Sequence, residues 1–302
     1  MKILISGSTG FVGSALIKLL TKNGHEVIRL VRHAPHYGRL EIGWDPNRGV
    51  IDKEHLEGME VVVHLAGENI GEGRWTKEKK RAIVDSRVKG TTLLSETLAT
   101  LRHPPAVFLC ASAIGYYGSR GDELLTETSA PGNDFLAHVC QEWEKAAAPA
   151  AEKGIRTVFT RFGIILAEHG GALAKMLMPF RMGIGGRMGD GKQWMSWIAL
   201  DDVVGALQFM MHDTAVSGPV NFVAPFPVTN AEFTKTLGSV LSRPTFLSVP
   251  RFGIRLAFGE MGDALLLGSQ RVEPAVLKER GFAFNFVRLE PTLKHILHRE
   301  YS

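Results

Sequence analysis

The chain has 302 residues, of which 45% are hydrophobic and 22% charged, and its formal net charge is +4. This composition is typical of a globular protein and excludes a chain that is disordered throughout. The charge excess is small, and the densest basic segment, KEKKR at 77–81, contains a glutamate, so nucleic-acid binding is not expected.

The cysteine content and the hydropathy exclude several further classes. Two cysteines, Cys110 and Cys140, cannot build a disulfide scaffold, and no Cys-x-x-Cys motif suggests a metal site. No apolar run reaches about 18 residues, and the N-terminus lacks the long apolar stretch of a signal peptide. We therefore expect a cytoplasmic protein that binds no metal ion and no membrane.

The first thirty residues have the clearest pattern. A short apolar strand at 3–5 leads into a glycine-rich turn, a helical pattern that ends at Asn23-Gly24, and a second strand at 26–31. Such a unit requires a parallel strand pair with a right-handed crossover. The turn consists of Gly7, Ser8, Thr9, Gly10, Phe11, Val12 and Gly13.

Glycines at 7, 10 and 13 allow a tight turn whose bare N–H groups, at the start of a helix, face a pyrophosphate. The flanking strand and helix are the context that a dinucleotide site requires. We predict that residues 7–13 bind a dinucleotide; the alternative is a glycine-rich turn without a ligand.

The alternation of strand and helix continues along the chain. Strands are predicted at 61–65, 107–111 and 156–162, and helices at 76–101 and 135–153. This order predicts an α/β fold, a Rossmann-type doubly wound parallel sheet with a smaller C-terminal substrate-side lobe. We assign residues 1–165 to the dinucleotide-binding Rossmann domain, to whose sheet later segments return, and 166–302 mainly to the interleaved lobe.

The lobe is less regular in sequence. Helices are predicted at 203–211 and, after a cap at Thr229, up to Leu241. Trp197 is expected in the core, whereas Trp194 fits either a core position or a surface that stacks on a ligand ring. Asp201-Asp202 opens a helix, where carboxylates are favourable, and its role is predicted to be structural.

The residue after the second strand points to the cofactor. NAD sites carry an acidic residue about 20 residues beyond the turn, which binds the ribose 2′-hydroxyl. Here Val31 is followed by Arg32, whose guanidinium suits a 2′-phosphate. This favours NADP; the alternative is an exposed surface arginine that leaves NAD acceptable.

Several segments together resemble a known group. The G-x-x-G-x-x-G turn resembles the extended short-chain dehydrogenase/reductase superfamily. The segments LAGENI (65–70), RWT (74–76), SAIGYYG (112–118), FLAHVCQEWE (135–144), GGALAKMLMPFRMGIGG (170–186) and GDGKQWMSWIALDD (189–202) resemble its atypical epimerase family, the family 39U group. The resemblance spans the chain and implies NADP binding, whereas the word epimerase says little about the chemistry.

The resemblance implies further cofactor contacts. The expected additional contacts are Leu65, Ala66, Gly67, Glu68, Arg87, Ser112, Phe135, Gly163 and Ile164. For Arg87, the alternative to a cofactor contact is a structural salt bridge.

The catalytic segment departs from the superfamily pattern. Ser112 falls where the superfamily has its catalytic serine, but no Tyr-x-x-x-Lys occurs between 112 and 160. Phe135 and Val139 fill those two positions, and neither can transfer a proton. Tyr116, Tyr117 and His138 are candidate substitutes, of which Tyr116 is favoured.

We therefore predict an NADP-dependent oxidoreductase acting on a small or sugar-like carbonyl or alcohol. A non-catalytic NADP-binding sensor is the main alternative, and a nucleotide-sugar epimerase, which needs the Tyr–Lys pair, is less favoured. The expected partners are a small-molecule substrate and a second copy, paired through the helices at 76–101 and 135–153.

Overall fold

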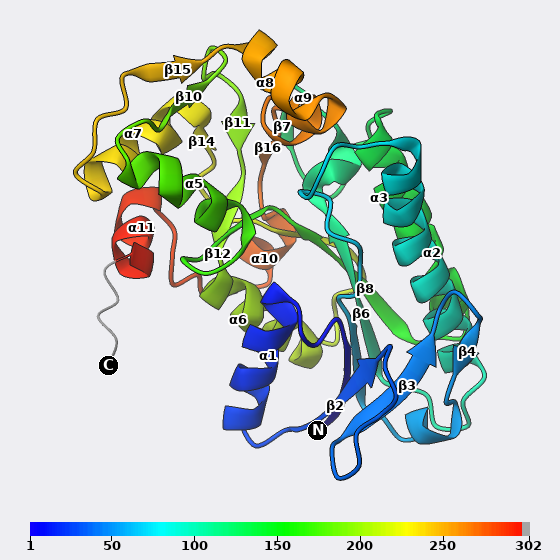
Figure 1. Ribbon diagram of the computed structural model, residues 1–302. Coiled ribbons are helices and arrows are strands. Elements are labelled where there is room, and N and C mark those ends of the chain that lie inside the picture. The colour runs from blue at the N-terminus through cyan, green and yellow to red at the C-terminus, as the bar shows by residue number, and fades with distance from the viewer. Residues whose placement is uncertain (298–302) are drawn as a thin grey trace.

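The structure is a computed structural model that describes residues 1–297. Its largest element is an eight-stranded sheet in the order β13-β8-β6-β5-β1-β2-β3-β4 (Figure 1). Neighbouring strands are parallel except β3 and β4. The strands are β1 (Lys2–Ser6), β2 (Glu26–Val31), β3 (Glu41–Asp45), β4 (Val50–Ile51), β5 (Val61–His64), β6 (Val107–Ala113), β8 (Arg156–Phe162) and β13 (Gly218–Phe222). The predicted doubly wound parallel sheet is confirmed.

Five of these strands were predicted, and three at the sheet edges were not. In β3, only Ile42 and Trp44 are buried, so its apolar signal is half that of a central strand. The outermost strand β13 begins with Gly218-Pro219, residues that indicate a break in sequence but are tolerated at an edge.

Helices cover both faces of the sheet. One face carries α1 (Phe11–Lys22) and α6 (Leu200–His212), and the other carries α2 (Lys77–Ala99), α3 (Phe135–Lys145) and α4 (Ala148–Glu152). The helix predicted at 135–153 is thus divided into α3 and α4. Pro149, in the first turn of α4, lacks the N–H that an uninterrupted helix would use.

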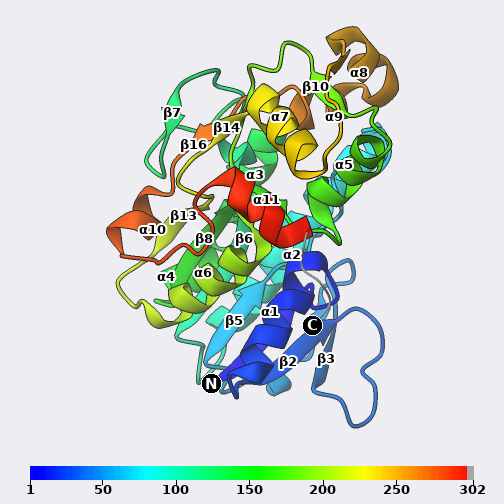
Figure 2. The same cartoon turned by 90° about the vertical axis from the view of Figure 1, so that its left-hand side faces the viewer.

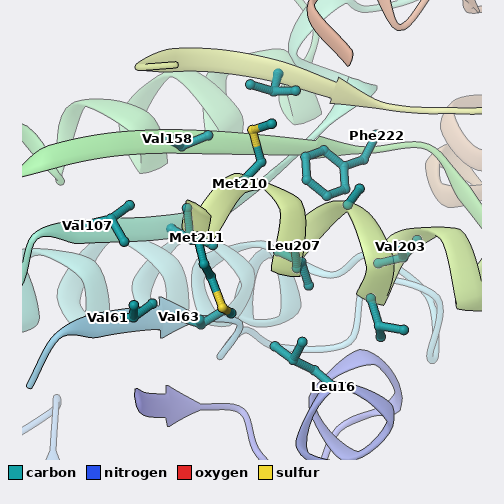
Figure 3. Packing of buried hydrophobic residues seen from close by; sticks show 14 of the residues in the cluster. Leu16, Val61, Val63, Val107, Val158, Val203, Leu207, Met210, Met211 and Phe222 are labelled. Carbon is teal, nitrogen blue, oxygen red and sulfur yellow. The ribbon is translucent and has the colours of Figure 1, made fainter. Parts of the chain in front are cut away.

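The main core lies between the sheet and α6. Figure 3 shows Leu207 and Met210 of α6 between Val158 and the pair Val61 and Val63 of the central strands, all in one core cluster. Val63, Val158 and Leu207 are completely buried. Because these strands are parallel, their carboxyl ends share one edge of the sheet.

The lobe is built from short pieces. Its four strand pairs are β9–β12, β10–β15, β11–β14 and β7–β16, each a two-stranded ladder. The strands are β7 (Leu124–Leu125), β9 (Ile164–Leu166), β10 (Gly186–Met188), β11 (Trp194–Met195), β12 (Trp197–Ala199), β14 (Val228–Thr229), β15 (Leu247–Val249) and β16 (Arg271–Val272). The helices are α5 (Gly171–Arg181), α7 (Asn230–Val240), α8 (Arg251–Phe258), α9 (Glu260–Leu265), α10 (Ala275–Glu279) and α11 (Leu289–Leu297). The rest of the predicted lobe, 298–302, lies outside the described residues.

Several predictions for this lobe are confirmed. Thr229 caps α7, and its capping box with Glu232 is complete. Trp197 is fully buried, and buried Asp202 accepts hydrogen bonds from the backbone N–H groups of Asn285 and Phe286. Asp202 therefore ties the chain near the C-terminus to α6. None of the helices in residues 1–297 is long and apolar enough to cross a bilayer.

Candidate functional site

The predicted site residues gather at the carboxyl ends of the central strands. Gly7 follows β1 with φ +66°, and a Cβ atom on it would lie 2.7 Å from the carbonyl carbon of Leu65. A Cβ atom on Gly13 would lie 2.2 Å from the carbonyl oxygen of Gly7. Both positions therefore require glycine, because the turn packs against backbone that cannot move aside.

The turn opens α1 without a cap. Gly10 is the N-cap residue, it offers no side chain to the first-turn N–H groups, and the first turn holds no acidic residue. These N–H groups, with the positive end of the helix dipole, are a candidate anion-binding site. The backbone of residues 7–13 thus fits the predicted pyrophosphate.

Arg32 projects from the end of β2. Its side chain is exposed and has no ion pair with any residue in the described part of the chain. At the start of β3, Glu41 accepts hydrogen bonds from the backbone N–H and the Nδ1 of His36, at 3.0 and 2.8 Å, and these bonds lower the pKa of Glu41. The nearby acid is therefore engaged, and Arg32 is available for an anionic group.

The loop after β2 and the first residue of β3 together hold three side chains of the kinds that bind metals. Ligand atoms of His33, His36 and Glu41 lie within 4.8 Å of one another. The expectation of no metal ion remains a prediction, and this loop is where it would be tested first.

A buried serine–histidine pair supports the segment after β5. His64 is fully buried, and its Nδ1 lies 2.6 Å from the hydroxyl oxygen of Ser6. The same oxygen accepts hydrogen bonds from the backbone N–H groups of Leu65 and Ala66, at 3.2 and 3.3 Å. Burial lowers the pKa of His64 to about 4, so the ring is neutral near pH 7. Ser6 thereby fixes the start of the predicted adenosine-side segment.

Arg87 braces that segment from α2. Its Nη1 donates to the carbonyl oxygens of Glu68 and Ile83, at 3.1 and 3.2 Å, and its guanidinium lies over the Trp143 ring at 4.9 Å. Its Cζ also lies 3.3 Å from where a Cβ atom of Gly67 would be. The structure therefore replaces the alternative of a salt bridge with bonds to carbonyls; a direct cofactor contact stays a prediction.

Ser112 occupies a different environment from the one predicted. Its side chain is buried, and its hydroxyl donates to Oε1 of Glu144 in α3 at 2.7 Å. Side chains alternate along β6, and Ser112 shares the face of Phe108 and Cys110, which is covered by α2 and α3. This geometry does not support a contact between the Ser112 hydroxyl and substrate.

A buried ion pair continues this network. Arg161 of β8 donates from Nε and Nη2 to the two carboxylate oxygens of Glu144, both at 2.8 Å, and from Nη1 to the Tyr117 hydroxyl at 2.9 Å. Burial alone lowers the pKa of Arg161, but the bonds and charge of Glu144 reverse this and raise it. Burial raises the pKa of Tyr117 to about 12, and its hydroxyl donates to Asn221. Tyr117 is therefore held protonated inside the protein.

Tyr116 is different from its neighbour. It is half-buried on the 3-10 turn η2 (Ile114–Tyr117), and the Arg161 guanidinium carbon lies 3.5 Å from its ring centroid. Among residues 1–297, none hydrogen-bonds the Tyr116 hydroxyl. Tyr116 is thus the tyrosine of this segment whose hydroxyl is not committed to the protein.

Helix α3 carries no Tyr–Lys pair on its face toward β6. That face is formed by residues one position beyond the predicted Phe135 and Val139. Gly115 of η2 faces Leu136 and Cys140, and Ser112 contacts Glu144, so residues 136, 140 and 144 form the face toward β6. Phe135 instead contacts Trp75, with ring centroids 5.2 Å apart. His138 is exposed, which argues against its predicted catalytic role.

Gly163 and Ile164 connect the sheet to the lobe. The N–H of Gly163 donates to the Phe222 carbonyl, and that of Ile164 to the Ser196 carbonyl at 2.8 Å. A Cβ atom on Gly163 would lie 2.5 Å from the Ser196 oxygen, so only glycine fits. Whether either residue lines the cofactor stays a prediction.

Further contacts between sheet and lobe escaped the sequence analysis. Cβ atoms built on Gly170 and Gly171 would lie only 2.6 and 3.2 Å from the Phe11 ring, so the two glycines let this ring pack against the lobe. Lys175 donates to the Gly71 carbonyl at 2.6 Å, and Lys80 pairs with Glu260 at the same distance. The adjacent Gly170-Gly171 is the sequence signal that could have revealed the contact with Phe11. Arg161, a charged residue inside an apolar strand, could have revealed the buried ion pair with Glu144.

Comparisons with known proteins agree with this geometry. Residues 3–222 match the model of the NAD dependent epimerase/dehydratase family, and residues 249–296 match a domain of unknown function, DUF1731. The chain is 43% identical to the epimerase family protein MT2273 of Mycobacterium tuberculosis over 283 residues, 94% of this chain and 93% of that one. It is 36% identical to human epimerase family protein SDR39U1 over 300 residues, 98% and 100% of the two chains.

The fold is equally similar. A crystal structure of human SDR39U1, isoform 2, with NADPH superposes with a TM-score of 0.90 and 33% identity, covering 99% of this chain and 100% of that one. The predicted resemblance to the atypical reductase group is confirmed. The chain therefore belongs to the NAD-dependent epimerase/dehydratase family, with the SDR39U1-like epimerase family proteins as its relatives.

Proposed function

We propose that this protein is an NADP-dependent oxidoreductase acting on a small or sugar-like carbonyl or alcohol. The observation that carries the proposal is the uncapped glycine turn at 7–13 combined with an unpaired Arg32 where an NAD site needs an acid. The NADPH in the structure of human SDR39U1 supports the same cofactor.

The roles of the chain's own residues follow from their positions. The N–H groups at the start of α1 bind the pyrophosphate, and Arg32 binds the 2′-phosphate through its guanidinium. Bound NADPH supplies a hydride to the carbonyl carbon of the substrate. Tyr116 donates its hydroxyl proton to the carbonyl oxygen, which becomes the alcohol, and solvent returns the proton to Tyr116.

The assignment to Tyr116 rests on its uncommitted hydroxyl. Tyr117 is buried and bonded, the Ser112 hydroxyl is bonded to Glu144, and His138 is exposed on α3. The Cys140 thiol is buried, which raises its pKa to about 12 and removes it as an acid near pH 7. Tyr116 therefore remains as the candidate proton donor.

The non-catalytic sensor remains the second candidate. The engaged Ser112 and the Leu136–Cys140 face of α3 favour it, because neither offers a group that activates a carbonyl. On this reading NADP binding changes how the lobe contacts a partner, and no turnover occurs.

Cofactor binding is tested first. Purified protein is titrated with NADPH and NADH by fluorescence, together with Arg32→Glu and with the control Arg48→Glu. Arg48 is also exposed but lies in the turn between β3 and β4. Loss of a charged hydrogen bond costs about 1.5–3 kcal/mol, so Arg32→Glu weakens NADPH binding at least about tenfold.

Arg32→Glu should change the affinity for NADH little. Arg48→Glu should change the affinity for NADPH little. Equal affinity of the unaltered protein for NADPH and NADH would contradict the NADP assignment. If NADPH binds but Arg32→Glu leaves its affinity intact, Arg32 is not the 2′-phosphate ligand.

Turnover is tested separately. A panel of aldehydes, ketones and sugar carbonyls is screened by loss of NADPH absorbance, and active compounds are repeated with Tyr116→Phe and Tyr117→Phe. We expect Tyr116→Phe to lower kcat by about 10²–10⁴-fold with NADPH affinity unchanged. Activity that survives in Tyr116→Phe removes Tyr116 from the mechanism; NADPH binding without turnover on any carbonyl favours the sensor.

We also propose a reducing compartment, the cytoplasm, and a homodimer through α2 and α3. The compartment is supported by two free, buried thiols at Cys110 and Cys140. Sedimentation of the purified protein tests the dimer.

A further inference from the structure

A cavity lies in the lobe, away from the glycine turn at 7–13. It is formed at the ladders β7–β16 and β11–β14 and has a volume of about 230 Å³. Its apolar walls are Leu124, Trp194 and Phe226, with prolines on both sides of Phe226. In both Figures 1 and 2, β7, β14 and β16 lie in the upper half of the molecule and α1 in the lower half.

One cation in this cavity, Arg271, has no hydrogen-bond acceptor and no counter-charge within residues 1–297. The Arg271 guanidinium carbon lies 4.5 Å from the Trp194 ring centroid, and Trp194 is itself fixed by a 2.7 Å hydrogen bond from its Nε1 to Asp122. The Arg271 Nε is buried without a hydrogen-bond partner among the described residues. The one acid in the wall, Glu273, is instead paired with Lys278.

These observations specify the missing partner. A buried guanidinium N–H without an acceptor is costly, and a carboxylate is the group whose geometry fits it best. A dianion is disfavoured, because the wall offers one unpaired cation and already contains Glu273.

The rest of the cavity specifies the body of the ligand. Leu124 and Phe226 are 50% and 55% exposed, so a ligand that covers them removes apolar surface from water. The volume is below the roughly 300–1,000 Å³ typical of pockets for drug-sized ligands, which limits the ligand to a compact molecule.

We propose that this cavity binds a small organic monocarboxylate with a compact apolar ring. The carboxylate accepts hydrogen bonds from Arg271, and the ring packs on Phe226 and Leu124. The site is separate from the proposed cofactor site and does not depend on the proposed oxidoreductase activity.

The test compares an acid with its neutral isostere on the unaltered protein. Phenylacetate and phenylacetamide are titrated by ligand-observed NMR and by calorimetry, with and without saturating NADPH. We expect phenylacetate to bind at least tenfold more tightly than phenylacetamide, and equally well with NADPH present. Equal binding of the two compounds, no binding of phenylacetate, or its displacement by NADPH would each overturn the proposal.

Variants locate the binding. Arg271→Met should weaken phenylacetate binding at least tenfold and leave phenylacetamide unaffected, whereas Arg271→Lys should retain part of the affinity. Arg48→Met is the control, since Arg48 is exposed in the turn between β3 and β4 and does not line the cavity. Equal losses in Arg271→Met and Arg48→Met would indicate unspecific charge attraction and overturn the site.

Discussion

The sheet half and the lobe of this molecule differ in the kind of groups that they offer to a ligand. In the sheet half, one eight-stranded sheet brings the strand ends to a common edge, and backbone N–H groups form the anion site. In the lobe, two-stranded ladders hold the candidate groups, and these are side chains such as Trp194 and Arg271. The first kind of site is fixed by the fold, whereas the second changes with single residues.

The surfaces differ in the same direction. Of the fifteen large hydrophobic side chains that the described chain exposes, eleven lie after residue 165. Substrate specificity and partner contacts are therefore expected in the lobe, and cofactor binding in the sheet half.

The largest effect is expected from breaking the buried ion pair between Glu144 of α3 and Arg161 of β8. Glu144→Gln leaves the Arg161 guanidinium, whose side chain is 3% exposed, without a counter-charge. Removing one partner of such a pair costs about 3–5 kcal/mol in the free energy of unfolding. Chemical denaturation measures this loss. The control is Glu290→Gln, which removes one partner of the exposed pair with Lys294 and should change the free energy of unfolding by less than about 0.5 kcal/mol.

The double variant Glu144→Gln/Arg161→Met sharpens this test. Because it also removes the orphaned charge, it should lose less stability than the sum of the two single variants. An additive loss would show that the two side chains do not act as a pair.

Acid should destabilise the sheet half through His64. Its pKa in the folded protein is about 4, below the ordinary 6.5, so the unfolded chain takes up the proton first as the pH falls. The stabilisation is full above pH 6.5 and is lost as the pH falls to 4, by about 3 kcal/mol in total.

Denaturation curves between pH 7 and 4 measure this loss. His64→Gln should be less stable at pH 7 but should have a flatter dependence on pH. The control His138→Gln, at an exposed position with no ion pair among the described residues, should keep the slope of the unaltered protein. An unchanged slope in His64→Gln would contradict the assignment.

Two glycines with the same backbone conformation distinguish binding from stability. Gly7 (φ +66°) faces backbone at 2.7 Å, whereas Gly24 (φ +76°) has nothing within 4 Å of a built Cβ atom. Gly7→Ala should cost about 2 kcal/mol and abolish NADPH binding; Gly24→Ala should cost about 1 kcal/mol and leave binding intact. Thermal melts and NADPH titration measure both, and retained NADPH binding in Gly7→Ala would contradict the site.

The smallest effect belongs to the lobe. Thr229→Ala removes the cap of α7, where Thr229 accepts from the Glu232 N–H at 3.3 Å, and should cost about 1 kcal/mol. NADPH affinity should not change, because α7 contributes nothing to the strand edge. A loss of NADPH affinity would show that the two halves are coupled.

Much of the sheet half could be predicted. β2 and β8 lie at their predicted bounds, because their apolar runs and flanking glycines or charges are local signals. The strand β3 and the edge strand β13 were missed because half-buried or proline-containing segments lack that signal. The predicted role of Ser112 depended on which way one side chain of β6 points, and the packing of α3 decides that.

The sequence by itself determined the fold class, the glycine turn and the cationic residue after β2, because strand periodicity, left-handed glycine and the residue next to a strand end are properties of local sequence. Only the tertiary structure decided the partners of Ser112, Arg161 and Arg271. Each partner comes from a segment distant in the chain, and burial, which makes a missing or a satisfied hydrogen bond energetically important, exists only once those segments are packed together.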